Sequence, residues 1–337
     1  MSPPPPPPAV LVSNGAISPH APPPAASFLE STPGAYTTAR ALLWWPRHLR
    51  RLADSARLLA RSHPHLLGLP SPRALDFSDT HVLSLVNPSV RVAIDEMRRR
   101  RPATEEDLAV TALLRGGGSG DGLDVFVHVG AYVPPVFGED GARVAVAGGG
   151  RDAAAAKYAP WARIRKSMEK MRPPGVTELL LTNDGDHILE GSVTNFFVVC
   201  RKEEHQRNGP FSNQTLDNKF EVQTAPLSDG ILPGIIRQIV IEVCHDIGIP
   251  VREVSPSWST HELWQEAFVT SSLRLIQHVE SVQVPLLWKD VQSKSWNDVS
   301  WAVKQFQGAG CITTLLQREI LKRARTEEYD IKGFCEL

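Results

Sequence analysis

The most constraining feature of this chain is a pair of apolar runs, residues 177–181 and 188–199, joined by the turn-forming residues 183–186 (NDGD). This arrangement predicts a β-hairpin. A third strand is predicted at 220–224, and apolar residues at helical spacing then predict a helix over 234–247. Because strands and a helix alternate here, we expect a mixed α and β architecture.

Alternating apolar residues, typical of strands, and apolar residues at helical spacing also predict elements before and after this stretch. Glycines 148–150 indicate a linker rather than a phosphate loop, because no Gly-x-x-x-x-Gly-Lys pattern occurs in the chain. The tail, 298–324, ends in a basic helix to which we assign only packing. Further strands are predicted at 34–40, 109–114, 124–133, 251–254 and 267–270, and further helices at 48–63, 90–100 and 259–265.

The length of 337 residues favours two domains over one. Residues 1–27 are rich in proline, with an unbroken run from Pro3 to Pro8, and we expect a disordered tail there. We expect a small α+β domain over residues 28–150. We expect a larger domain, in which strands alternate with helices, over residues 151–337.

Composition excludes several classes of function. The net charge of −1 gives no reason to expect nucleic acid or an acidic membrane surface as a partner. The four cysteines lack metal-ligand spacing, so we expect buried thiols in a reducing compartment and no metal site. No stretch reaches the roughly 18 apolar residues of a membrane span. We expect a cytoplasmic protein, with a plastid or another organelle as the alternative.

Three segments carry a resemblance to a known family. They are 153–166 (AAAAKYAPWARIRK), 190–197 (EGSVTNFF) and 232–237 (LPGIIR). Together they resemble the class IV (fold type IV) pyridoxal-phosphate aminotransferases, which include D-amino-acid transaminase, branched-chain aminotransferase and aminodeoxychorismate lyase. The resemblance covers 34–284, and a polar insert at 201–219 is typical of a lengthened surface hairpin.

The resemblance implies a fold, a cofactor and an assembly. It implies an α+β fold with a small N-terminal α/β domain and a larger C-terminal pseudo-barrel domain. Pyridoxal 5′-phosphate would be bound between them, and the protein would form a homodimer.

The resemblance also implies two catalytic residues. Lys157 would form the Schiff base, and Glu190 would face the pyridine nitrogen and keep it protonated. A lysine among alanines is otherwise typical of a surface, but Lys157 precedes Glu190 by 190 − 157 = 33 residues, close to the family spacing. Lys166 and Lys170 do not give that spacing. Pro160 departs from the family, which often has asparagine there.

The cofactor phosphate requires an anion site. Backbone N–H groups at the start of the predicted helix can supply one, although Ile236 replaces a threonine that the family often has. Asn195 would orient the loop that leads into this helix. Arg51 matches the arginine of a His-x-x-Arg-Leu pattern, and a fork-shaped cation suits a dianion. The implied cofactor-binding residues are Arg51, Glu190, Asn195, Leu232, Gly234, Ile235, Ile236, Ser271 and Ser272.

The substrate side is less defined. Tyr36 stands where the family often has an aromatic residue in the pocket. Arg115 and His128 lie in the region that offers groups for a substrate carboxylate, although a lone histidine in a strand is often only structural. D-amino-acid transaminase has an arginine and a histidine two residues apart for this purpose, and that pair is not present here.

Three functions remain open. The first is an aminotransferase that resembles D-amino-acid or branched-chain transaminase. In it, Lys157 would move the Cα proton of a small amino acid, and a 2-oxo acid would then take up the amino group by the same steps in reverse. The second is a lyase of the aminodeoxychorismate type that eliminates pyruvate. The third is a low-activity, cofactor-binding relative with a regulatory role, suggested by Pro160, Ile236 and the missing Arg/His pair.

Overall fold

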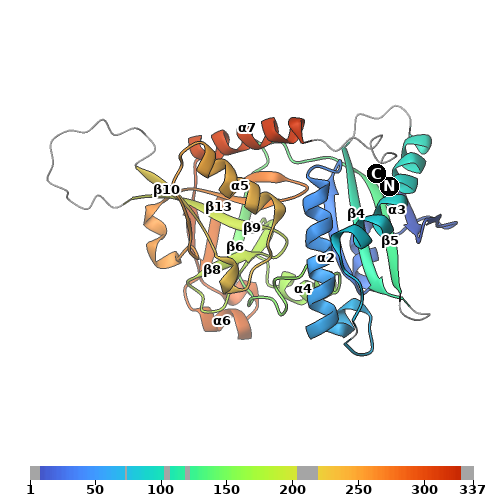
Figure 1. Ribbon diagram of the computed structural model, residues 1–337. Helices are drawn as coiled ribbons and strands as arrows, with labels where there is room; N and C mark the ends of the chain where they lie inside the picture. The colour runs from blue at the N-terminus through green and yellow to red at the C-terminus, as the bar shows by residue number, and fades with distance from the viewer. Residues whose placement is uncertain (1–7, 73, 102–106, 118–121, 203–218, 328–337) are drawn as a thin grey trace, which may run out of the picture. The chain divides into compact units, whose positions relative to one another are not determined.

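The structure is a computed structural model that describes residues 8–72, 74–101, 107–117, 122–202 and 219–327 (Figure 1). The chain divides into two compact units. The N-terminal unit holds the described residues up to Pro134, together with Ala155–Lys166 and the described residues from Ala324 onward. The C-terminal unit holds Pro135–Ala154 and Ser167–Arg323.

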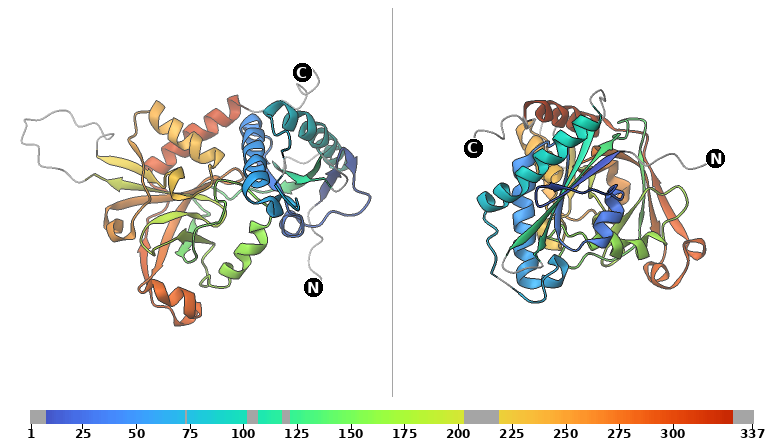
Figure 2. Two further views of the ribbon diagram at one scale, coloured as in Figure 1. Left: turned by 60° about the horizontal axis from the view of Figure 1, so that its bottom comes forward. Right: turned by 90° about the vertical axis from the view of Figure 1, so that its right-hand side faces the viewer.

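The N-terminal unit contains a five-stranded antiparallel sheet with the order β2-β1-β5-β4-β3. Helices α2 and α3 pack on the sheet and against each other (Figures 1 and 2). Its elements are β1 (Ala9–Ser13), β2 (Ala16–Ile17), α1 (Ala25–Ser31), β3 (Ala35–Arg40), α2 (Trp45–Ser62), the 3₁₀ helix η1 (Pro64–Leu67), α3 (Asp79–Arg100), β4 (Asp107–Gly116) and β5 (Leu123–Tyr132).

The alternation of side chains divides this sheet into two faces. Thr37 of β3 lies on the face that α2 covers, because its hydroxyl bonds with His48 of that helix. Tyr36 lies on the opposite face, where it packs with Leu113 of β4 and Phe28 of α1. Tyr36 and Thr37 are adjacent in the chain but lie on opposite faces of the sheet.

The short segment around residue 158 lies along the free edge of β3. Tyr158 forms an isolated antiparallel bridge with Ala35, and the N–H of Ala159 donates to the carbonyl of Gly34. These contacts explain why Ala155–Lys166 belongs to the N-terminal unit. The structure thus differs from a simple division at residue 150, since the chain returns to the first sheet after that point.

The expected disordered tail over 1–27 is wrong from residue 9 onward. β1 pairs with β5 over five residues, and Val10 and Val12 are fully buried. The alternating sequence AVLVS supplies a period-two strand, which the surrounding prolines obscured. Residues 1–7, including most of the proline run, lie outside the described residues.

The C-terminal unit contains a nine-stranded mixed sheet with the order β11-β10-β9-β12-β13-β6-β7-β8, with β14 paired to β13. Parallel pairs occur between β6 and β7, β6 and β13, and β10 and β11. Its strands are β6 (Ala142–Val146), β7 (Glu178–Thr182), β8 (Ile188–Gly191), β9 (Asn195–Arg201), β10 (Phe220–Thr224), β11 (Val251–Glu253), β12 (Trp264–Ser271), β13 (Leu275–Pro285) and β14 (Trp301–Gln305).

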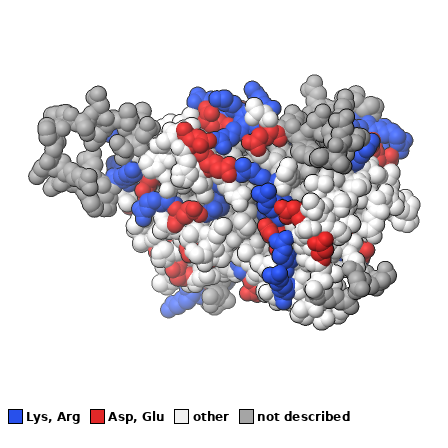
Figure 3. Space-filling view, in the orientation of Figure 1, with Lys and Arg blue, Asp and Glu red and all other residues white. Residues whose placement is uncertain are grey.

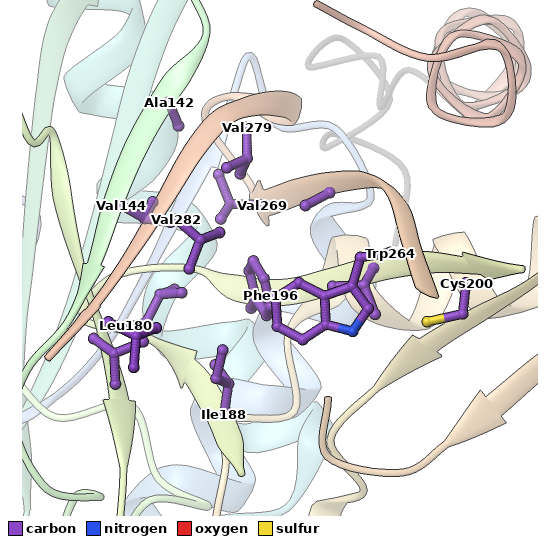
Figure 4. Close-up of a cluster of buried hydrophobic side chains, with 14 residues drawn as sticks. Ala142, Val144, Leu180, Ile188, Phe196, Cys200, Trp264, Val269, Val279 and Val282 are labelled. Carbon is purple, nitrogen blue, oxygen red and sulfur yellow. The ribbon is translucent and has the colours of Figure 1, made fainter. Parts of the chain in front are cut away.

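Helices and the hydrophobic core complete this unit. One face of the sheet contributes Phe196, Val269 and Leu180 to a buried cluster (Figure 4). On the other face Phe197 stacks on Phe268 at 4.8 Å between ring centroids, and α5 packs against β12. The helices are α4 (Trp161–Glu169), which spans the division at residue 166, α5 (Ile235–Asp246), α6 (Trp288–Ser293) and α7 (Cys311–Thr326), with 3₁₀ turns η3 (Leu227–Asp229), η4 (Trp258–Leu263) and η5 (Trp296–Asp298).

The α+β class and the pseudo-barrel sheet are confirmed, whereas several elements differ from expectation. The run 188–199 is two strands, β8 and β9, separated by a turn closed by the bond from Gly191 N–H to Thr194 O. The helix expected over 259–265 is a 3₁₀ turn that leads into β12. Residues 203–218, most of the polar insert, lie outside the described residues.

Candidate active site

Lys157 is anchored by its backbone at the edge of the N-terminal sheet. Its N–H donates to Ser55 Oγ of α2 at 3.0 Å, and its carbonyl accepts from Tyr36 N–H at 2.9 Å. Its Nζ lies 4.7 Å from the centroid of the Tyr36 ring, within the range of a cation–π contact. The alternative Lys166 has a largely exposed side chain that pairs with Glu30, so it is the surface lysine of the two.

Arg51 is held by a buried hydroxyl. Its Nη2 donates to Thr37 Oγ1 at 2.9 Å, and the same hydroxyl shares a 2.7 Å hydrogen bond with His48 Nδ1. Burial, with the positive charges of Arg51 and Lys157, holds the pKa of His48 well below its usual range. His48 is therefore neutral near pH 7. The resemblance picked out Arg51 but not the bonding role of Thr37 or His48.

Glu190 lies at the end of β8 with its side chain 3% exposed. Its Oε2 accepts from Leu232 N–H at 3.0 Å, and its Oε1 accepts from Arg151 Nε and Nη2, each at 2.8 Å. Arg151 Nη2 also donates to the carbonyl of Ala154 at 3.0 Å. The sequence interpretation missed Arg151. The feature of the sequence that could have indicated Arg151 is its position between glycines 148–150 and the proposed lysine.

The side chain of Asn195 bonds with the loop before α5, and its orienting role stays a prediction. Its Nδ2 donates to Leu232 O at 3.0 Å. A Cβ at Gly234 would lie only 2.0 Å from Asn195 Oδ1, so a glycine is required at this close approach.

The N-terminus of α5 has the form expected of an anion site. Gly234 is the N-cap and provides no side-chain cap. The N–H groups of the first turn have no intrahelical acceptors. The side chains of Ile235 and Ile236 are buried, so these residues can offer a ligand only their backbone N–H groups.

The end of β12 supplies hydroxyl groups. Ser271 Oγ accepts from Arg274 N–H at 3.2 Å, and Ser272 lies in the turn that follows. The neighbouring Thr270 Oγ1 is buried and has no hydrogen-bond partner among the described residues. Such an unsatisfied buried hydroxyl is unusual in a folded protein and is compatible with a polar ligand at this turn.

A second buried carboxylate connects two turns of the C-terminal unit. Glu178 of β7 pairs with Arg274 Nη1 at 2.8 Å. Its Oε1 accepts from Val193 N–H and Thr194 Oγ1, each at 2.9 Å. Glu178 thus orders the turn between Glu190 and Asn195 and the turn after β12.

Two of the three predicted substrate residues, Arg115 and His128, have structural partners within the N-terminal unit. Arg115 pairs with Asp124 at 3.0 Å and lies over the ring of Phe126. His128 is 4% exposed, and its Nε2 bonds with Pro23 O at 3.0 Å. Burial lowers the pKa of His128. A substrate role for these two residues stays a prediction that their contacts do not favour.

Two other kinds of site lack support in the part of the chain that the structure describes. Within these residues, no group of three or more His, Cys, Asp or Glu side chains is arranged to hold a metal ion. Again within the described ranges, no helix is both long and apolar enough to cross a membrane. Figure 3 shows Lys and Arg interspersed with Asp and Glu on one face.

Comparison with known proteins identifies the family. Residues 34–282 match the family of class IV amino-transferases. The chain belongs to this enzyme family. A probable branched-chain-amino-acid aminotransferase from Rickettsia conorii is 25% identical over 118 residues, which cover 35% of this chain and 34% of that relative. The matched part therefore spans about a third of the relative's length.

Solved structures of other aminotransferases share the fold. The branched-chain aminotransferase of Thermoproteus uzoniensis, solved with norvaline, has a TM-score of 0.60 at 19% identity and covers 96% of both chains. A hypothetical aminotransferase from Mycobacterium tuberculosis in its PLP-bound form has a TM-score of 0.60 at 18% identity, over 94% of this chain and 98% of that one.

Proposed function

We propose that this class IV aminotransferase binds pyridoxal 5′-phosphate and transfers an amino group between a small amino acid and a 2-oxo acid. The observation that carries the proposal is the anchoring of Lys157, whose N–H and C=O are both bonded while its Nζ lies against the Tyr36 ring. A fixed backbone with a side chain in aromatic surroundings suits a lysine that must present its amine to a ligand.

The residues present fit the cofactor. When bound, pyridoxal phosphate supplies an electron sink for the negative charge that develops at the substrate Cα. Lys157 would hold the cofactor and carry the proton, and Glu190 would accept from the ring nitrogen. In the C-terminal unit, the phosphate would be bound by the N–H groups of Ile235 and Ile236 and the hydroxyls of Ser271 and Ser272, and the unpartnered Thr270 Oγ1 is a further polar group next to Ser271. We propose Arg51 of the N-terminal unit as the cation that binds the same phosphate.

The names of the relatives favour a branched-chain amino acid over a D-amino acid as the substrate. The homodimer and the cytoplasmic or organellar location that the sequence suggested stay predictions. So does the lyase alternative, which the same residues would also serve.

Replacing Lys157 by alanine tests the proposal. The wild type should show a visible absorption band with pyridoxal phosphate, and borohydride should bleach it and label the peptide that contains Lys157. Lys157→Ala should lose the band and the label, while the control Lys166→Ala should keep both. Leucine, valine and D-alanine, each added without a 2-oxo acid, should identify the amino donor through loss of the band. A label on Lys166 would refute the assignment.

A further inference from the structure

Arg151 and Glu190 form a buried ion pair in the C-terminal unit. The side chains are 5% and 3% exposed. Two guanidinium N–H groups bind Oε1, and the Leu232 N–H binds Oε2, so both carboxylate oxygens have donors. This arrangement limits rotation of the carboxylate about its last bond.

We propose that Arg151 is a positioning residue of the active site, which keeps Glu190 ionised and in place and ties it to the backbone that leads to Lys157. The inference rests on the proposed function. The link to the backbone is the third bond of Arg151, from Nη2 to the carbonyl of Ala154, three residues before Lys157. One side chain thus connects the carboxylate to the last residue of the C-terminal unit before the segment Ala155–Lys166.

The physical basis is the cost of a buried charge. A carboxylate without a partner in a protein interior binds a proton instead of staying ionised. Arginine prevents this because its guanidinium keeps its charge at any ordinary pH. An ionised Glu190 can accept a hydrogen bond from a ring N–H and stabilise its positive charge, whereas a protonated Glu190 cannot do both.

The other charges around β8 already have partners in the same unit. The nearest carboxylate along the strand pair is Glu178, which approaches Gly191 and is bonded to Arg274. Asp229 of η3 accepts from Ser255, and Asp152 is the chain neighbour of Arg151. At the tip of the β7–β8 hairpin, His187 bonds with Asp184, and Asp186 accepts from Ser257.

Removal of the guanidinium should therefore add a pH dependence to cofactor binding, beyond that of the wild type. In Arg151→Met, Glu190 would bind a proton within the neutral range, and affinity for pyridoxal phosphate would fall as the pH decreases. A side chain that only supports the fold would weaken binding by a similar factor at every pH.

The experiment is titration of the unloaded protein with pyridoxal phosphate between pH 6.5 and 8.5. Relative to wild type, Arg151→Met should bind at least about tenfold more weakly at pH 6.5 and approach wild type at pH 8.5. Arg151→Lys, which keeps a cation, should restore most of the affinity at low pH. Adding Glu190→Gln to Arg151→Met should remove the added pH dependence, because no titratable carboxyl remains. Arg143→Met, an exposed arginine of the same unit, is the control.

Three results would overturn the inference. They are an equal loss at all pH values in Arg151→Met, no loss in Arg151→Met, and a pH dependence in the double variant that still exceeds that of the wild type. If Arg151→Met does not fold, Arg151→Gln, which removes the charge but keeps hydrogen-bond donors, decides the question. In that variant the pH midpoint of the visible absorption band should shift from the wild-type value, and an unchanged midpoint would contradict the proposal. A wild type that binds no pyridoxal phosphate would instead refute the proposed function.

Discussion

The region around Lys157 and the region around Glu190 are organised by different forces. In the first, the bonds to Lys157 and Arg51 that fix their positions come from Ser55, Tyr36 and Thr37, all neutral groups. In the second, the carboxylate of Glu190 is held by the cation of Arg151. The lysine region therefore contains hydrogen bonds to neutral groups, whereas the glutamate region contains a buried ion pair.

The largest effect should follow from removing the charge of Glu190. Glu190→Gln leaves Arg151 buried without its counter-charge, which should lower the free energy of unfolding by about 3–5 kcal/mol. Turnover should fall by about two to three orders of magnitude, because a neutral amide stabilises a ring cation poorly. Urea unfolding and single-turnover kinetics measure the two effects.

Glu221→Gln is the matched control for this prediction. Glu221 is also a buried carboxylate paired with an arginine, Arg252, in the same unit. This change should lower stability and leave turnover per folded molecule unaltered. Wild-type turnover in Glu190→Gln would show that Glu190 only maintains the fold.

Arg51→Lys tests the lysine region at its other cation. Lysine keeps the charge but lacks the fork that bonds Thr37 and suits a phosphate. Losing one hydrogen bond to a charged group costs about 1.5–3 kcal/mol, which corresponds to a tenfold to hundredfold weaker affinity for pyridoxal phosphate. Arg50→Lys, an exposed residue of the same helix, should change nothing. Equal losses in both variants would remove Arg51 from the site.

Thr37→Val should have a smaller effect, because it removes only the hydroxyl between Arg51 and His48. We expect the unfolding free energy to fall by about 1–3 kcal/mol and cofactor affinity to fall a few-fold. Thr37→Ser should restore both. Thr38→Val, on the same strand as Thr37, removes the hydroxyl bond to Thr111 of β4 and should leave affinity unaltered. If Thr38→Val weakens binding as much, the effect belongs to the strand and not to the hydroxyl.

The smallest effect is a pH dependence in the lysine region. Burial and the nearby cations lower the pKa of His48 in the folded state, so only the unfolded chain binds this proton as the pH falls below about 6.5. The contribution of His48 to stability is complete above that pH. It is lost at lower pH by at most about 1.4 kcal/mol per pH unit.

His48→Gln should remove this part of the pH dependence. The difference in unfolding free energy between wild type and His48→Gln, measured in urea, should shrink from pH 7.5 to pH 5.5. His65→Gln, at an exposed position in η1, should leave the wild-type slope intact. A constant difference for His48→Gln would mean that the folded state accepts the proton.

Local sequence patterns predicted individual strands and helices. They did not predict side-chain contacts between residues that are far apart in the chain. The β7–β8 hairpin and α5 follow from apolar periodicity and turn residues. Arg151 pairs with a residue 39 positions away, and no local pattern encodes such a contact. The bonding partners of Arg51 could not be predicted for the same reason, since Thr37 reaches it only when β3 packs under α2.

Strand β1 has a consequence for solubility. It covers the edge of β5, which would otherwise expose a row of unpaired N–H and C=O groups beside Val127 and Val129. A chain shortened by removal of the first seven residues keeps this cover, whereas one that begins at Phe28 loses it. The second chain would offer β5 to other molecules as a template for strand pairing, and aggregation would follow even though every proposed catalytic residue is present.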